Sequence, residues 1–279
     1  MSSLFMRFPG GKPKALTLSY DDGVEQDIQL ISIMNQYGLK GTFNLNSGCY
    51  AKEGTVYPQG TIHRRLSKDR ATKLYSESGQ EVAVHSLTHP FLEQLPPNIC
   101  SKEICEDRAN LEEQFDTIIR GMAYPFGTYN DAVVDTLKYN GVAYARTVIS
   151  SGNFWLPKDW LRLEATCHHK NLRLEELTKK FVEETPGRAP WLFYLWGHSY
   201  EFEADNNWHV IENFAKTISG KADIWYATNI EVYDYVKAYE QLRFNNAMTR
   251  VYNPTAMNLY FEYNGKEVMV PGGTEISFS

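Results

Sequence analysis

Side chains that can do acid–base and metal chemistry occur at three separate places in the sequence. Asp21 and Asp22 form an acidic pair, His85 and His89 stand four residues apart, and His198 lies much further along the chain. Two imidazoles and one carboxylate, with coordination positions left open, are the ligand set of a catalytic zinc ion or another divalent transition metal. The histidine spacing alone is weak, because short motifs match by chance. The acidic pair supplies the carboxylate that such a site needs.

The two adjacent carboxylates are unlike in their expected roles. Neighbouring side chains in an extended chain point to opposite sides, so one aspartate can bind a metal while the other faces the substrate as a base. The sequence Asp-Asp-Gly at Asp21–Gly23 is also a common turn. On these residues alone, both interpretations stay open.

The polar residues share one predicted location, the carboxyl ends of strands. Buried strands are predicted at Ala15–Tyr20, Glu81–Val84 and Trp191–Trp196. The acidic pair follows the first strand, His85 follows the second and His198 follows the third. Ligands bind at that edge in parallel α/β sheets and barrels, so we expect these groups to converge there.

Strands alternate with amphipathic helices along most of the chain. This alternation predicts an α/β fold, a mainly parallel sheet wrapped by helices, either open or closed into a barrel. From about Asn245, short antiparallel strands with hairpin turns are predicted. We expect residues 1–244 to form one large domain and residues 245–279 a small β appendage, because about 35 residues cannot build a core alone. The other predicted strands are Gly41–Leu45, Gly121–Tyr124, Val142–Thr147 and Asp223–Ala227, and the predicted helices are Ile28–Tyr37, Lys68–Ser78, Lys102–Ile118, Ala132–Tyr139, Leu174–Glu184, Ile211–Ser219 and Ile230–Gln241.

Composition and charge exclude several classes of protein. The 279 residues include 28 Lys and Arg against 34 Asp and Glu, a net charge of −6, which argues against a general nucleic-acid binder. No segment approaches the roughly 20 apolar residues that span a bilayer, and the first residues do not resemble a secretory signal. The four cysteines form no CxxC pair, which is typical of reduced thiols. We therefore expect a cytoplasmic protein with neither a nucleic-acid nor a membrane partner.

Three sequences, in their order and rough spacing, resemble motifs of the polysaccharide deacetylase family, the NodB-homology fold of carbohydrate esterase family 4. They are Leu18–Gly23 (LSYDDG), His85–His89 (HSLTH) and Leu195–His198 (LWGH). A fourth segment, Ala123–Gly127 (AYPFG), fits the family's third motif. The resemblance covers roughly residues 14–240. It implies a distorted (β/α) barrel with fewer than eight regular strands.

The resemblance also implies roles for individual residues. Asp21 is the implied general base, and His198 the implied general acid. Asp22, His85 and His89 are the implied metal ligands. The expected metal is Zn²⁺, with Co²⁺, Ni²⁺ and Mn²⁺ as alternatives.

Further residues are expected to bind the substrate or its oxyanion. The resemblance places a backbone N–H near Phe126 at the oxyanion, and aromatic faces beside the site can stack on sugar rings. Asp159-Trp160 is a weak match to the family's fourth motif. The segment Cys167-His168-His169 either lines the cleft or is a surface loop. The full expected set is Tyr124, Phe126, Tyr129, Trp160, His168 and Trp196.

The third motif departs from the family at one position. The family usually carries an arginine there that steadies the base, and this chain has Ala123. The sequence does not choose among four candidates to replace it, which are Arg108, Arg120, Arg146 and Arg162.

Three functions stay open on the sequence. The first is a metal-dependent hydrolase that removes N-acetyl or O-acetyl groups from an acetylated saccharide, with Asp21 taking a proton from metal-activated water and His198 protonating the leaving group. The second is an amidase of the same fold that acts on a C–N bond outside sugars. The third is a catalytically inactive carbohydrate-binding protein, motivated by Ala123. The sequence does not predict the oligomeric state.

Overall fold

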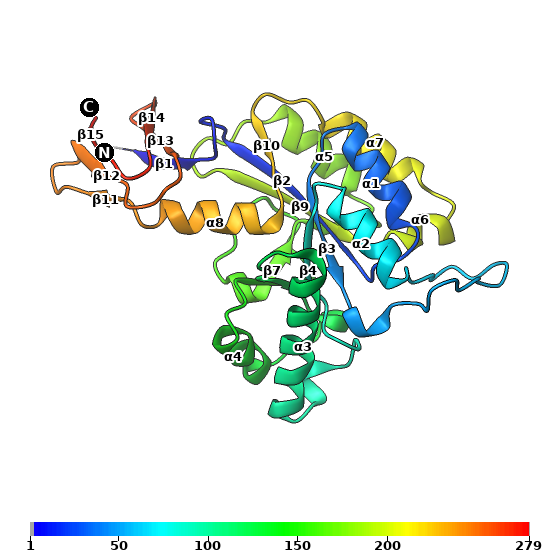
Figure 1. The fold of residues 1–279 in the computed structure, drawn as a ribbon. Helices are drawn as coiled ribbons and strands as arrows, with labels where there is room; N and C mark the ends of the chain where they lie inside the picture. The colour runs from blue at the N-terminus through cyan, green and yellow to red at the C-terminus, as the bar shows by residue number, and fades with distance from the viewer. Residues whose placement is uncertain (1–2, 279) are drawn as a thin grey trace.

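The computed structural model describes residues 3–278, which form one large parallel sheet and two small antiparallel sheets (Figure 1). Four of the nine strands in the large sheet, β5, β7, β8 and β10, have three residues or fewer, so the regular strands number fewer than eight. The nine strands are β2 (Lys14–Asp21), β3 (Gly41–Leu45), β4 (Glu81–Val84), β5 (Gly121–Ala123), β6 (Tyr144–Ser150), β7 (Leu163–Ala165), β8 (Cys167–His168), β9 (Trp191–Gly197) and β10 (Ile224–Tyr226).

The short strands β7 and β8 join the two ends of the large sheet. Strand β7 pairs in parallel with β6, and β8 pairs in parallel with β9. Only Thr166 separates them, and its backbone N–H donates to the carbonyl oxygen of Tyr194 in β9 at 2.8 Å. Since β9 also pairs with β2, the sheet returns to its starting strand. The predicted distorted (β/α) barrel is confirmed.

Strand β2 shows how the barrel separates its two faces. All of its residues are buried. Leu16 and Leu18 pack in the main apolar core between strands and helices. The alternate side chains of Thr17, Ser19 and Asp21 point to the opposite side, where they hydrogen-bond across the barrel interior. The interior is therefore polar, and Asp21 lies at its carboxyl end.

Eight α-helices in the described residues cover the sheet, with α1, α5 and α7 grouped together and α3 packed beside α4 (Figure 1). Within residues 3–278, none of them has the length and apolar content needed to cross a membrane. Helix α3 begins five residues before its predicted start, at Pro97, because proline at the first helical position has no N–H to lose. The helices are α1 (Asp27–Gln36), α2 (Lys68–Ser76), α3 (Pro97–Phe115), α4 (Asp131–Tyr139), α5 (Leu174–Glu183), α6 (Tyr200–Ala204), α7 (His209–Ile218) and α8 (Asn229–Tyr239).

The two small sheets form an appendage at the end of α8, at the left of Figure 1. Val251, Phe261, Val270 and Phe278 are its buried core. Residues before Asn245 take part in both sheets, and the boundary between residues 244 and 245 stays a prediction. One sheet contains β1 (Leu4–Arg7), β13 (Leu259–Tyr263) and β14 (Lys266–Val270), and the other contains β11 (Arg243–Phe244), β12 (Arg250–Tyr252) and β15 (Glu275–Ser277).

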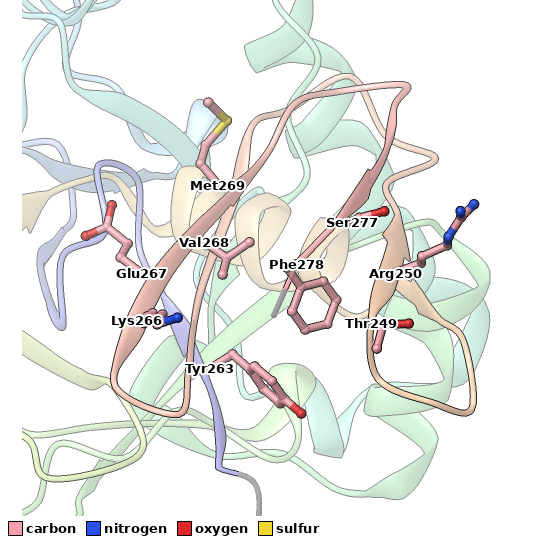
Figure 2. A pocket seen from close by; sticks show the side chains of 9 residues that line it. All are labelled: Thr249, Arg250, Tyr263, Lys266, Glu267, Val268, Met269, Ser277 and Phe278. Carbon is pink, nitrogen blue, oxygen red and sulfur yellow. The ribbon is translucent and has the colours of Figure 1, made fainter.

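An open pocket of about 590 Å³ lies on this appendage (Figure 2). The rings of Tyr263 and Phe278 form part of its wall and meet edge to face, with centroids 5.1 Å apart. Arg250 on its rim pairs with Glu275 at 3.2 Å. None of the residues predicted to do chemistry lines this pocket.

Candidate active site

The predicted ionisable residues converge at the carboxyl edge of the barrel. His85 Nε2 lies 3.9 Å from Asp21 Oδ2 and 4.0 Å from Asp22 Oδ1. His89 Nε2 also lies 4.0 Å from Asp22 Oδ1. On the other side of Asp21, His198 Nε2 lies 3.8 Å from Oδ2. The carboxyl end of β2 and the loops after β2, β4 and β9 therefore bring all five side chains into one cluster.

Asp22, His85 and His89 can hold a metal ion. Their ligand atoms all lie within 4.8 Å of one another. His85 Nδ1 lies 2.8 Å from the carbonyl oxygen of Ala123, which can only accept, so Nδ1 carries the proton. This fixes the tautomer and turns the Nε2 lone pair toward the carboxylates, as second-shell bonds do for metal-bound histidines. Two imidazoles and one carboxylate fit a divalent transition metal such as zinc.

The backbone at these ligands is strained. Asp22, Ser86 and His89 have φ values of 85°, 64° and 59°, in the left-handed region, which costs a non-glycine residue about 1–3 kcal/mol. The side-chain amide of Asn46 donates to the carbonyl oxygens of His85 and Ser86, the latter at 2.8 Å. These bonds help to hold the loop after β4 in the conformation that presents both imidazoles.

Asp21 is buried and paired with Arg146. Their side chains are 3% and 1% exposed, and the guanidinium contacts Asp21 Oδ2. The guanidinium also lies over the Trp196 ring, 4.2 Å from its centroid, and Asn44 donates to Asp21 Oδ1 at 2.8 Å. Burial raises the pKa of Asp21, but the charges of Arg146 and then His85 lower it by more. The net pKa therefore lies below its ordinary value. Asp21 is therefore a carboxylate at neutral pH.

Arg146 lies directly opposite Ala123 in the parallel pairing of β5 with β6. Partner residues on adjacent strands share one face of the sheet, so the guanidinium enters the barrel at the level of position 123. Of the four candidate arginines, Arg146 is the one whose side chain contacts Asp21. The others pair elsewhere: Arg108 with Glu112, Arg120 with Asp234, and Arg162 with Asp131 and Asp159.

Glu201 of α6 contacts His198 on the side of the ring away from Asp21. Glu201 Oε2 lies 3.4 Å from His198 Nδ1, 3.1 Å from His168 Nε2 and 3.2 Å from His169 Nε2. The backbone N–H of Lys170 donates to His168 Nδ1 at 3.0 Å, so the proton of neutral His168 is on Nε2, facing Glu201. His168, His198 and Glu201 lie close enough to hold a metal, but this tautomer makes His168 a donor to the carboxylate instead.

The charges around His198 favour its protonated form. Burial lowers the pKa of His198, but the bond to Glu201 and the charge of Asp21 raise it more, so the net pKa lies above its ordinary value. Burial raises the pKa of Glu201, but its bonds to the three histidines hold that pKa well below its usual range. The anion therefore persists beside His198 and stabilises the imidazolium.

We expect Glu201→Gln to lower the pKa of His198, because an amide cannot stabilise the imidazolium as a carboxylate does. NMR titration of the imidazole Cε1–H signals measures this pKa directly. Glu203→Gln is the matched control, since Glu203 lies two residues further along and pairs with Arg64 at 2.8 Å instead. An unchanged pKa in Glu201→Gln would show that another group sets the protonation of His198.

The other predicted substrate-binding residues differ in how close they lie to the cluster. Phe126 is 50% exposed, and its ring centroid lies 4.5 Å from that of His89. The Trp196 ring packs against the Arg146 guanidinium, and its centroid lies 4.5 Å from that of the His168 ring. Trp196 therefore contacts residues that pair with Asp21 and with Glu201. Tyr129 is half-buried and stacks on Tyr124 at 4.8 Å.

Two predicted residues are not brought to the site. Tyr124 is buried, and its hydroxyl donates to the carbonyl oxygen of Leu161 at 2.7 Å. Its position follows from strand alternation: Ala123 faces the barrel interior with Arg146, so the next side chain points outward into the core. Trp160 is buried in a second apolar cluster, edge-on to Tyr233 of α8 at 5.1 Å.

Sequence reasoning missed two residues that contact Asp22. His63 Nε2 lies 3.2 Å from Asp22 Oδ2, and Arg65 lies 3.0 Å from Oδ1. The His63 ring also meets the edge of Tyr200 at 5.0 Å. Burial raises the pKa of Asp22, but His63 and Arg65 hold it well below its usual range. Both residues lie in the irregular segment before α2, where no hydrophobic period marks their position.

Comparison with known proteins confirms the family resemblance. Residues 9–145 match the sequence profile described as polysaccharide deacetylase. A provisionally assigned polysaccharide deacetylase from Mycobacterium smegmatis has 15% identity and a TM-score of 0.57, over 84% of this chain and 93% of that one. A family 4 carbohydrate esterase from Streptomyces lividans, in complex with acetate, has 16% identity and a TM-score of 0.51, over 76% and 90%. At these identities the two structures show a shared fold.

A third structure covers less of the chain. The deacetylase PplD from Streptococcus pyogenes, in complex with acetate, has 21% identity and a TM-score of 0.42, over 47% of this chain. The present chain spans about half of that protein's length, 55%.

Proposed function

We propose, from the polysaccharide deacetylase domain that this chain carries, that it is a metal-dependent hydrolase that removes acetyl groups from a carbohydrate. The observation that carries the proposal is the cluster at the barrel edge, in which Asp21 lies 3.9 Å from His85 and 3.8 Å from His198. It combines a candidate metal site, a buried ionised carboxylate and an imidazole whose protonated form is favoured. These are the three parts that hydrolysis of an acetyl group needs.

The residues that would hold the metal are Asp22, His85 and His89, whose donor set fits zinc first and Co²⁺, Ni²⁺ or Mn²⁺ as alternatives. A bound ion supplies Lewis acidity, which lowers the pKa of a water ligand to about 7 and polarises a carbonyl oxygen. Arg65, bonded to the carbonyl and the carboxylate of Asp22, keeps this ligand in place.

Asp21 is the proposed general base. Its Oδ2 faces both His85 and His198 at the cluster's centre, so it can take a proton from an attacking water there. Arg146 keeps the carboxylate ionised, and the bond from Asn44 fixes its orientation. A general base in such a position contributes about 10²–10⁴ in rate.

His198 is the proposed general acid. Its Nδ1 faces Glu201, which leaves Nε2 directed toward Asp21 and the reacting group. An amine leaving group needs this proton most, because an amide anion leaves very poorly. The backbone N–H near Phe126 is the proposed oxyanion donor, and one such donor is worth roughly 3 kcal/mol.

Ala123, in place of the arginine that the family usually has, is the feature that favours a catalytically inactive protein. Arg146 provides a guanidinium to Asp21 from the neighbouring strand, at the same level of the barrel. The substitution at position 123 therefore does not leave the base without a cationic partner.

We expect the purified, zinc-loaded protein to release acetate from N-acetylated oligosaccharides, and EDTA to abolish the release until zinc is restored. An assay of free acetate measures both effects. The same assay with O-acetylated sugars distinguishes hydrolysis of an acetyl ester from hydrolysis of an acetyl amide. Circular dichroism of the EDTA-treated protein controls for unfolding. Hydrolysis of small non-sugar amides in place of acetylated sugars would favour the amidase alternative. No metal binding and no turnover would contradict both enzymatic functions.

A further inference from the structure

The two turns that carry Asp22 and His198 diverge where their strands end. Strands β2 and β9 pair in parallel as far as Tyr20 and Gly197. Beyond that level, one chain turns at Asp22, whose φ is 85°, and the other runs into α6. A displacement of about 1 Å in a catalytic group can cost roughly 10²-fold in rate. The candidate metal ligand and the proposed acid therefore need a contact that fixes the distance between their turns.

The carboxyl group of Asp27, the first residue of α1, bonds to both turns. Its Oδ2 accepts from the backbone N–H of Val24 at 3.2 Å, two residues after Asp22. Its Oδ1 accepts from the hydroxyl of Ser199 at 2.5 Å, and Ser199 directly follows His198. The backbone N–H of Asp27 also donates to the carbonyl oxygen of Val24 at 3.0 Å. One side chain thus bridges the turn of Asp22 and the turn of His198.

This bridge is completely buried. Asp27 and Ser199 are both 0% exposed, and a third donor, the hydroxyl of Tyr75 in α2, bonds to Asp27 Oδ2 at 2.6 Å. Burial raises the pKa of Asp27 to about 7, although the three bonds act against that rise. A buried carboxyl group is costly to the fold, and an apolar side chain of similar volume would pack there without that cost. What the carboxyl group adds is its bonds to the two turns.

We propose that Asp27 is a positioning residue, which holds the turn of His198 at a fixed distance from the turn of Asp22. This inference rests on the proposed function. Asp27 acts through Val24 and Ser199 rather than on the reacting atoms. His198 has to bring its proton to the leaving group while Asp22 stays at the candidate metal site, so both turns must be held at once. The bond to Ser199 sets where the imidazole lies, and the bond to Val24 sets where Asp22 lies.

Two substrates separate the proton transfer from the rest of the reaction. An N-acetylated tetrasaccharide has an amine leaving group that needs a proton, whereas 4-nitrophenyl acetate releases a stable phenolate without one. With zinc-loaded full-length protein, we expect Ser199→Ala to lower kcat for the tetrasaccharide roughly 10- to 10²-fold. KM and zinc content should stay the same, and so should kcat for 4-nitrophenyl acetate. Ser78→Ala is the matched control and should change neither rate, since it removes another buried serine hydroxyl, which donates to the carbonyl oxygen of Tyr75 at 2.7 Å.

Asp27→Ala removes both bonds of the bridge. We expect it to lower kcat for both substrates and to weaken zinc retention, because the turn that carries Asp22 is freed as well. Hydrogen–deuterium exchange measures the turns without any substrate. The amides of residues 198–202 should exchange faster in Ser199→Ala, and those of residues 22–24 should do so as well in Asp27→Ala. Ser199→Ala loses a single hydroxyl and decides the inference if Asp27→Ala does not fold.

Several results would contradict the inference. Equal losses of kcat on the two substrates in Ser199→Ala would mean that the hydroxyl supports the fold rather than the position of His198. Unchanged kcat on both would mean that the bond positions nothing. If the wild-type protein releases no acetate from the tetrasaccharide, the proposed function fails, and hydrogen–deuterium exchange decides this inference separately. Faster exchange at residues 198–202 in Ser199→Ala but not in Ser78→Ala supports it, and equal exchange in both variants and the wild type contradicts it.

Discussion

We expect Asp22→Ala to lose the metal together with the activity, and Asp21→Asn to keep the metal and lose turnover. Asp22 Oδ1 lies 4.0 Å from the Nε2 atoms of both His85 and His89, so removal of this carboxylate leaves two ligands. Asp21 is instead bonded to Arg146 and Asn44. An amide at position 21 cannot accept a proton, so we expect turnover to fall about 10²–10⁴-fold. Metal content by mass spectrometry and acetate release measure the two effects.

Controls for this pair of variants come from the same chain. Asp131→Asn removes a surface carboxylate, 93% exposed, and should change neither metal content nor turnover. Thermal unfolding of Asp21→Asn is needed as well, because the variant leaves Arg146 buried without its anion. Equal metal loss in both site variants would exchange the roles assigned to the two carboxylates.

Arg146→Gln should raise the pKa of Asp21 and lower turnover at neutral pH. Burial then acts on Asp21 without the strongest of the charges that oppose it. The base must be ionised, so activity is lost as pH falls through its pKa, and a raised pKa moves that loss to higher pH. We expect roughly a 10²-fold drop in kcat/KM at pH 7 and a loss of about 3–5 kcal/mol in unfolding free energy. Arg146→Lys should recover part of both, since it keeps the charge without the planar fork.

The pH dependence of kcat/KM distinguishes these effects from simple unfolding. Thermal melts first identify the temperature at which each variant is folded, and the pH–rate profile is then recorded below it. Arg162→Gln is the matched control, because its partners Asp131 and Asp159 lie at the surface. A profile for Arg146→Gln that superimposes on the wild-type profile would show that Asp21 works without a cationic partner.

The strands that carry the cluster were predictable because their patterns are strong. Gly41–Leu45 and Glu81–Val84 match their predicted ranges, and the ends of three strands correctly located the ionisable residues. The family motifs then distinguished Asp21 from Asp22, which spacing alone could not do. These roles stay predictions until the variants above are measured.

Residues that act across the barrel could not be predicted in the same way. The choice of Arg146 depends on the register between β5 and β6, which no local pattern encodes. Glu201 sits in a helix of five residues, too short for a hydrophobic period. His63 belongs to an irregular segment, so only the folded structure brings it to Asp22.

The register of Ala123 against Arg146 bears on how related sequences are compared. Positions 123 and 146 lie side by side on neighbouring strands, so an arginine at either position can place its guanidinium at the same level of the barrel interior. Arginines at both positions would bring two like charges to one buried level, so we expect them to exclude each other across homologues. A column-by-column alignment would score this chain as having lost its arginine. A comparison that takes the columns of Ala123 and Arg146 together would score the same chain as retaining it.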